Sequence, residues 1–149
     1  MMVERMKRQL ALLGFSLLLA GCATPYIDDS YRSIAQDSRA QFLIIHYTAI
    51  DFPKSMHVLT QGGRVSSHYL VRDDPPEIYR LVDENRRAWH AGVSSWQGHT
   101  QLNASSIGIE IVNLGYQKNP DGTLTWQDYP PGQIEAVVAL VKKIVKEHD

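Results

Sequence analysis

The hydrophobic positions from residue 41 onward predict strands separated by polar turns. Phe42–Tyr47 is a continuous apolar run, which is typical of a strand covered on both faces. Two shorter segments, Ser67–Val71 and Ile78–Val82, also predict strands. Ile107–Asn113 alternates strictly, so its three isoleucines face one way and the residues between them face the other. The pattern therefore predicts a sheet with at least one strand whose two faces carry different kinds of side chain.

An amphipathic helix is predicted over Gln133–His148, and a short one over Met56–Gln61. The apolar positions of the longer helix form one stripe: Ile134, Val137, Val138, Val141, Ile144, Val145 and His148. The polar segment 92–106 predicts a long loop. Helices interspersed among strands indicate the α/β class, here a single domain with a central mixed β-sheet flanked by helices. Because the last helix needs a surface to cover, we expect a last strand of the sheet beyond Asp149.

The first 22 residues have the pattern of a signal peptide. Three basic side chains within residues 5–8 precede an apolar run over residues 10–20, which is too short to span a membrane as a helix. The run Leu-Ala-Gly-Cys that ends at Cys22 resembles the lipobox of bacterial lipoproteins, in which the cysteine becomes the N-terminus and is acylated. Because Ala23 rather than Asp follows, this resemblance implies an outer membrane lipoprotein facing the periplasm, attached through its lipid anchor.

Three regions follow from this pattern. Residues 1–21 are expected to form a lipoprotein signal peptide, and residues 22–40 the lipidated Cys22 with a flexible tether. That tether segment is polar and shows no apolar period. Residues 41–149 are expected to form the folded domain.

Composition narrows the class of protein. Hydrophobic residues make up 44% and charged residues 21%, which is ordinary for a globular chain. The formal net charge is −1 with scattered basic residues, so we expect no nucleic acid as a partner. A single cysteine excludes an internal disulfide and a multi-cysteine zinc cluster. We expect a monomer.

Two residues on predicted strands have chemistry that a core position does not need. His46 closes the first apolar strand, at the end where sites form in α/β proteins, although a buried structural histidine would show the same pattern. Glu110 lies in mid-strand beside Gly108, where an unpaired carboxylate is costly. It is either half of a structural ion pair or a general base with a raised pKa.

Other histidines have weaker contexts. His90 follows Trp89 at the edge of the long loop, and His68 lies in a strand. His57 and His99 look like ordinary surface or packing residues. The chain contains no H-E-x-x-H, G-x-S-x-G or P-loop motif, so zincin, serine-nucleophile and nucleotide chemistry lack support.

Four segments, taken in order, resemble one family. I-H-Y-T-A, S-S-H-Y-L-V, A-W-H-A-G and S-I-G-I-E are similar to the zinc-dependent N-acetylmuramoyl-L-alanine amidases of the amidase-2 type. That family includes T7 lysozyme-like amidases and peptidoglycan recognition proteins. The resemblance covers residues 41–149, and the lipobox adds a likeness to its outer-membrane lipoprotein members.

The resemblance implies a Zn²⁺ cofactor and hydrolysis of the amide between N-acetylmuramic acid and L-alanine of peptidoglycan or muropeptides, in cell-wall turnover or recycling. By position, His46 would be a zinc ligand and Glu110 the catalytic base. His90 would contact substrate, and His68 would be structural.

The sequence also departs from the family. The second zinc histidine and the acidic ligand belong to a G-H-x-D-I-A-P-like stretch, which would begin beyond Asp149. We therefore expect the chain as given to be C-terminally incomplete and inactive by itself. Two alternatives stay open. One is a non-catalytic peptidoglycan-binding lipoprotein, against which the presence of both His46 and Glu110 argues. The other is a structural lipoprotein without a ligand.

Overall fold

The computed structural model describes residues 24–148, which fall into two units. In the first unit, which ends at Ala35, residues 24–35 are exposed and form neither helix nor strand. The second unit begins at Gln36. The predicted signal peptide and Cys22 lie outside the described residues, as does any strand beyond Asp149. Within residues 24–148, no helix has the length and apolar content needed to cross a membrane.

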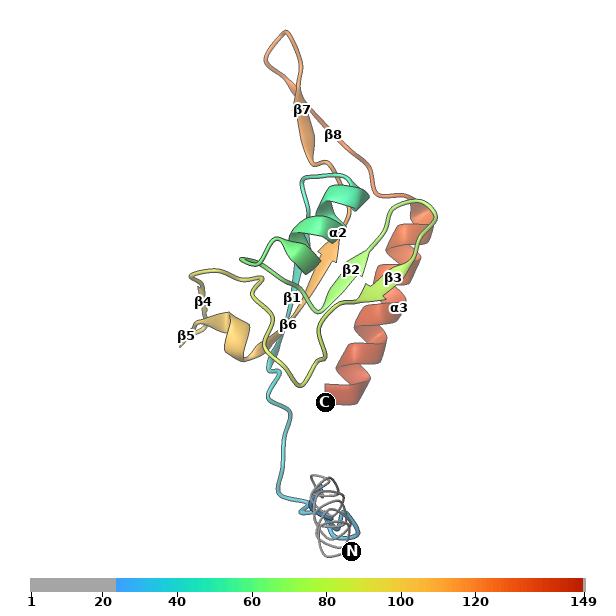
Figure 1. The fold of residues 1–149 in the computed structure, drawn as a ribbon. Coiled ribbons are helices and arrows are strands. Elements are labelled where there is room, and N and C mark those ends of the chain that lie inside the picture. Colours follow the sequence, from blue (N-terminus) through green and yellow to red (C-terminus); the bar gives the residue numbers. More distant parts are fainter. Residues whose placement is uncertain (1–23, 149) are drawn as a thin grey trace, which may run out of the picture. The chain divides into compact units, whose positions relative to one another are not determined.

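A four-stranded mixed sheet forms the centre of the second unit (Figure 1). Its strand order is β1-β6-β2-β3, with bounds Phe42–Tyr47 for β1, Ser106–Ile111 for β6, Tyr69–Val71 for β2 and Ile78–Arg80 for β3. β6 runs parallel to both β1 and β2, whereas β3 is antiparallel to β2. The predicted α/β class with one central mixed sheet is confirmed.

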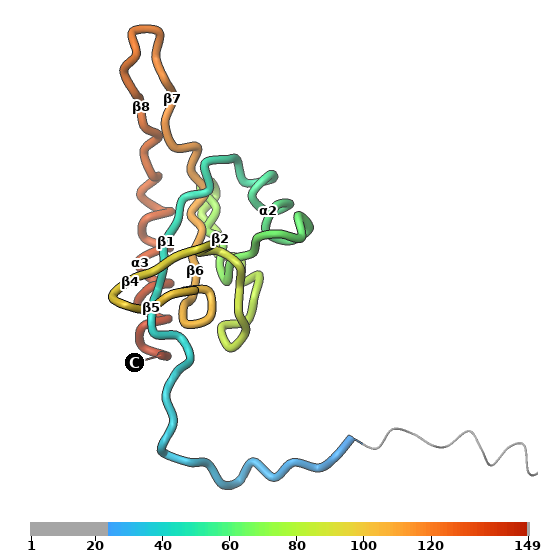
Figure 2. Tube along the Cα trace, turned by 90° about the vertical axis from the view of Figure 1, so that its left-hand side faces the viewer, coloured from blue at the N-terminus to red at the C-terminus, as the bar shows by residue number. Residues whose placement is uncertain are grey.

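Two helices lie on opposite sides of this sheet, as Figures 1 and 2 show from perpendicular directions. α2 spans Phe52–Gln61 and α3 spans Pro131–His148. α2 begins four residues earlier than predicted, because Asp51 caps it and Pro53 fits the first turn. The Asp51 side chain accepts a hydrogen bond from the Lys54 amide at 2.9 Å.

The core lies between the sheet and α3. The three isoleucines of β6, which alternation placed on one face, pack with Tyr69 and Val71 of β2 and with Leu140 and Ile144 of α3. All seven residues are buried. The strict alternation of β6 therefore sorts its side chains as predicted, with the isoleucines toward α3 and Gly108 and Glu110 toward the opposite face.

β1 differs from the prediction of a strand covered on both faces. Ile45 is 49% exposed and Tyr47 is 44% exposed. β1 pairs only with β6 in the described part of the chain, so it is an edge strand of the sheet. The buried side chains of α3 pack on β6 and β2 instead, which leaves the α3-facing side of β1 partly open.

The long loop and the C-terminal half contain two small hairpins that the hydrophobic pattern did not indicate. The predicted loop holds β4 (Ser95–Trp96), β5 (His99–Thr100) and the 3₁₀ helix η1 (Leu102–Ala104). β7 (Tyr116–Lys118) and β8 (Leu124–Trp126) form a hairpin that projects from the sheet (Figures 1 and 2). Its tip contains a turn at residues 120–122.

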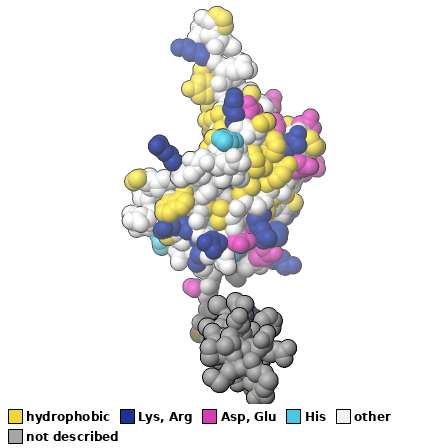
Figure 3. Space-filling view, viewed as in Figure 1, with side chains coloured by type: hydrophobic (Ala, Val, Ile, Leu, Met, Phe, Trp, Pro, Cys, Tyr) yellow, Lys and Arg dark blue, Asp and Glu magenta, His cyan; other side chains and the backbone are white. Residues whose placement is uncertain are grey.

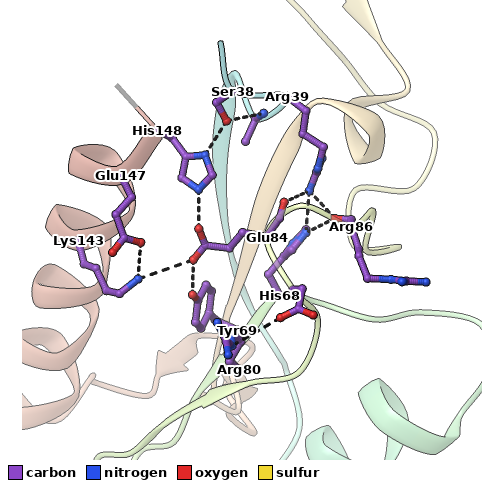
Figure 4. Close-up of polar contacts among 12 residues, drawn as sticks. Ser38, Arg39, His68, Tyr69, Arg80, Glu84, Arg86, Lys143, Glu147 and His148 are labelled. Atoms are coloured by element: carbon purple, nitrogen blue, oxygen red, sulfur yellow. Dashed lines mark hydrogen bonds and ion pairs between the residues drawn. The ribbon is translucent and has the colours of Figure 1, made fainter. Parts of the chain in front are cut away.

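The residues just before β1 belong to the folded unit and not to a free tether. Arg39 donates hydrogen bonds to the carbonyl oxygens of Glu84, at 2.5 Å, and of Arg86 (Figure 4). Ser38 lies 2.5 Å from Nδ1 of His148. The boundary predicted at residue 41 therefore moves to Gln36, because side chains of the expected tether pair with the loop 81–87 and with α3.

Charged side chains of both signs are spread over the face seen in Figure 3. In this view Lys and Arg side chains lie among acidic and apolar groups, and they do not form one basic patch. The surface in this view is in keeping with the formal net charge of −1.

Candidate active site

His46 and Glu110 lie side by side across two parallel strands. His46 is the fifth residue of β1, and Glu110 is its register partner on β6. Both strands are parallel, so their carboxyl ends meet at the same edge of the sheet, where sites form in α/β folds. The two residues that the sequence singled out first are thus brought together by strand register alone.

A pocket of about 200 Å³ opens beside these strands. Glu110 and His90 lie in its wall together with apolar side chains from α2 and the segment after it, among them Val58, Leu59 and Val65. Burial raises the pKa of Glu110 to about 7. No ion pair joins Glu110 to a cation in the described residues, so the structural ion-pair reading has no support there. A half-buried carboxylate of this kind suits a general base near neutral pH.

His90 packs against the backbone of β6 at Gly108, on the same face as Glu110. A Cβ atom on Gly108 would lie 2.4 Å from Cγ of the His90 ring. Gly108 is therefore needed for the imidazole to approach the strand this closely. A glycine within a strand permits such a close approach, which any side chain would block.

Three polar contacts hold His90, and a fourth holds the amide of the next residue, Ala91. Oδ1 of Asn103 accepts the amides of His90 at 2.9 Å and of Ala91 at 2.8 Å, which fixes the backbone. The ring contacts Ser106 Oγ through Nε2 at 3.1 Å and Nε2 of His46 through Nδ1 at 3.2 Å. Both ring nitrogens of His90 thus have partners inside the protein.

His68 is fully buried beneath the site. Its Nδ1 accepts the amide of Gly108 at 2.9 Å, and its Nε2 lies 3.0 Å from the carbonyl oxygen of Arg86. It therefore ties β6 to the loop that leads to His90, which is the structural role predicted for it. His57 is exposed on α2, and His99 packs edge-on against Phe42 with 5.0 Å between ring centroids.

Burial keeps the three clustered imidazoles neutral. It lowers the pKa of His46 and that of His68. Burial lowers the pKa of His90 to about 4, helped by the charges that His46, His68 and Arg39 carry when protonated. Neutral imidazoles keep one lone pair each, which is the form that can accept a proton or bind a metal ion.

The described residues do not make up a metal site. Among residues 24–148, no group of three or more His, Cys, Asp or Glu side chains is arranged to hold an ion. A catalytic zinc usually has three protein ligands, and here only His46 stands where the family resemblance places one. We therefore derive no chemical step from a metal.

Sequence reasoning missed Asn103 and the hydroxyl of Ser106, both buried. Nothing in their local pattern separates them from ordinary loop residues. It also missed a second hollow of about 690 Å³, lined by the long loop. The exposed ring of Trp89 lies in the walls of both hollows, with the Arg87 guanidinium 4.1 Å from its centroid.

Comparison with known proteins agrees with this geometry. AmiD of Escherichia coli (strain K12), an N-acetylmuramoyl-L-alanine amidase, is 41% identical over 96% of this chain and 56% of its own length. Its structure with anhydro-N-acetylmuramic acid-L-Ala-D-γ-Glu-L-Lys matches with a TM-score of 0.73 and 43% identity, over 82% of this chain and 49% of that one.

AmpDh3 of Pseudomonas aeruginosa, in complex with anhydromuramic pentapeptide, matches with a TM-score of 0.71 and 41% identity, over 84% of this chain and 53% of that one. The chain thus spans about half the length of these relatives. The family model described as N-acetylmuramoyl-L-alanine amidase matches residues 36–149. Its start at residue 36 agrees with the start of the compact unit. This chain therefore belongs to the amidase-2 family of N-acetylmuramoyl-L-alanine amidases.

Proposed function

We propose that this protein hydrolyses the amide bond between N-acetylmuramic acid and L-alanine of peptidoglycan or muropeptides, in cell-wall turnover or recycling. The observation that carries the proposal is the register pair His46 and Glu110 beside a pocket at the carboxyl ends of β1 and β6. Membership of the amidase-2 family supports it.

Glu110 is the general base of this proposal. Hydrolysis of an amide needs a group that takes a proton from the attacking water and later gives one to the leaving amine. Burial raises the pKa of Glu110 to about 7, so the carboxylate can do both near neutral pH. The apolar side chains around it make the surroundings less polar and so strengthen its interaction with the reacting atoms.

Two relatives were solved with anhydromuramyl peptides bound. We therefore propose 1,6-anhydromuramyl peptides as the first substrates to test. The Trp89 ring, between the two hollows, offers an apolar face on which a sugar or a peptide can lie.

Zn²⁺ is the cofactor that the family implies, and we propose His46 as one of its ligands. Bound zinc would polarise the amide carbonyl and lower the pKa of a bound water. The check is the zinc content of the purified intact gene product. His46→Ala should lower it, and His57→Ala, which alters an exposed histidine, should not. Equal zinc in both variants would remove His46 from the ligand set.

The activity test uses Glu110→Gln in the intact gene product. We expect kcat for an anhydromuramyl tripeptide to fall by about 10²–10⁴, the usual contribution of a positioned general base. Release of the stem peptide is followed by mass spectrometry. Glu135→Gln, which neutralises an exposed carboxylate on α3, is the matched control and should keep full activity.

The same experiment separates the enzyme from a non-catalytic peptidoglycan-binding protein. A binder would retain muropeptide affinity and release no stem peptide in any variant. If the wild type hydrolyses the substrate and Glu110→Gln does so equally fast, Glu110 is only a buried charge.

We also propose that Cys22 is acylated and anchors the protein to the outer membrane, facing the periplasm. The support is the lipobox-like run before it, since these residues lie outside the described structure. Radiolabelled palmitate should be incorporated by the wild type and not by Cys22→Ser. Labelling that persists in Cys22→Ser would contradict the proposal.

A further inference from the structure

Three side chains form a line of polar contacts into the site, running from Ser106 through His90 to His46. The first contact fixes where the proton of Ser106 lies. Its Oγ is 2.6 Å from the carbonyl oxygen of Leu102, and two oxygens at this distance are joined by a hydrogen bond. A carbonyl has none, and a serine hydroxyl has one. Ser106 therefore donates to Leu102.

This leaves Ser106 only an accepting role toward His90. Nε2 of His90 lies 3.1 Å from Oγ, so Nε2 carries a hydrogen. The ring lies between two other imidazoles, with centroids 5.4 Å away for His46 and 5.7 Å away for His68. In this half-buried cluster the neutral form is favoured, so Nδ1 of His90 carries a lone pair. Nε2 of His46, at 3.2 Å, is then the donor.

We infer that Ser106 and His90 are positioning residues that set the tautomer of His46. In this arrangement Nε2 of His46 carries the hydrogen and donates it to His90, and the lone pair of His46 is on Nδ1. Asn103 contributes by holding the backbone amide of His90. His90 therefore acts through His46, in addition to lying in the wall of the pocket, where the family resemblance implies a substrate contact.

The consequence for the site rests on the proposed function. A histidine that binds a metal normally donates its other ring N–H to a fixed acceptor, which orients the ring. Nδ1 of His90 is such an acceptor for His46. Nδ1 of His46 is thus the ring nitrogen whose lone pair is available to bind an ion or to accept a proton.

The test reads tautomers directly and needs neither metal nor activity. Histidine labelled with ¹⁵N is incorporated into the intact gene product, which is stripped of metal with a chelator and studied by two-bond ¹H–¹⁵N NMR. In the wild type we expect both His46 and His90 as the Nε2–H tautomer. A wild-type spectrum with His90 as Nδ1–H overturns the inference by itself.

Ser106→Ala removes the acceptor of His90 Nε2. We expect a measurable fraction of His90 to change to the Nδ1–H tautomer, and His46 to change with it. Ser67→Ala is the matched control, because Ser67 is equally buried and donates to the Gly108 carbonyl at 2.8 Å. Ser106→Thr keeps the hydroxyl and should restore the wild-type tautomers.

Two results would contradict the inference. In one, Ser106→Ala leaves both tautomers unchanged. In the other, Ser67→Ala changes them as much, which would mean a general disturbance of the fold. An enzyme inactive on muropeptides with the expected tautomers would contradict the proposed function and leave the positioning role in place, so the two failures are distinguishable.

Discussion

Glu110 lowers the stability of the fold at the position where its chemistry is needed. A carboxylate on the site face of a central strand has lost much of its hydration. Its neighbours are a glycine and a neutral histidine, and among residues 24–148 no cation compensates its charge. The lost hydration makes folding less favourable, and it also raises the pKa of Glu110. The cost in stability and the basicity useful for catalysis therefore have the same physical origin.

This residue-scale argument predicts a pH-dependent effect of Glu110→Gln on stability. The pKa of Glu110 rises from the usual 4.5 to about 7 on folding. Below the unfolded value the carboxyl is protonated in both states and has no effect. As the pH rises from about 4.5 to about 7, the unfolded chain ionises while the folded protein still holds the proton, so the wild type loses stability across this range, and the loss is complete above about 7.

Glu110→Gln should therefore melt at a higher temperature than the wild type at about pH 8, and at a similar one at about pH 4. Thermal unfolding followed by circular dichroism, in the presence of a chelator, measures the difference. A difference in Tm that stays the same across this range would show that the pKa of Glu110 is not raised.

At the scale of elements, only a few side chains of α3 pack against the sheet. Ile144 is the one fully buried member of the predicted stripe. Leu140, which the stripe did not include, is buried beside it, and both contact the isoleucines of β6 and two residues of β2. Gln133, also fully buried, donates to the carbonyl oxygens of Val71 and Val112 at the far end of the helix. Val137 and Val141 of the stripe are partly buried against this core, whereas Ile134, Val138 and Val145 are about half exposed.

Ile144→Ala should thus lower the free energy of unfolding by about 2–5 kcal/mol, the usual range when a buried Ile becomes Ala. Val145→Ala is the neighbouring control. Its side chain is 51% exposed, so its loss should be much smaller. Urea unfolding of both variants gives the comparison, and equal losses would mean that α3 does not pack in the orientation described.

At the scale of the whole folded unit, Glu84 joins segments that are far apart in the chain. Its carboxylate accepts the hydroxyl of Tyr69 from β2 and lies 2.5 Å from Nε2 of His148 at the end of α3 (Figure 4). Burial raises the pKa of Glu84, but the hydrogen bonds from Tyr69 and His148 outweigh it. The pKa is therefore lower than usual.

Because that pKa is lowered, the stability that Glu84 contributes is present above its unfolded value and is lost as the pH falls through the folded value. Glu84→Gln should destabilise the protein at about pH 7 by roughly 1–3 kcal/mol, since buried partners lose a charged acceptor. Glu77→Gln is the exposed counterpart, with its own tyrosine and arginine partners.

Chemical unfolding at about pH 7 and about pH 3 checks this. The gap between Glu84→Gln and the wild type should narrow at the lower pH, and Glu77→Gln should stay close to the wild type at both. A Glu84→Gln variant as stable as the wild type at neutral pH would mean that the network seen in Figure 4 adds little to the fold.

The sequence by itself determined the α/β class, the main strands and helices, and the two residues central to the site. The alternation in β6 and the helical period of α3 are local patterns in the sequence, so they predict these elements without any knowledge of the tertiary structure. The hairpins β4–β5 and β7–β8 escaped because their short, exposed strands have no buried face to impose a period.

Only the tertiary structure decided which residues meet. Within the described residues β1 is an exposed edge, because strand pairing and helix placement are long-range features that a hydrophobic run does not encode. The line from Ser106 through His90 to His46 joins three segments, and the proton assignments along it depend on distances of 2.6 to 3.2 Å. Such distances exist only once parallel register and the close approach at Gly108 have fixed the backbones.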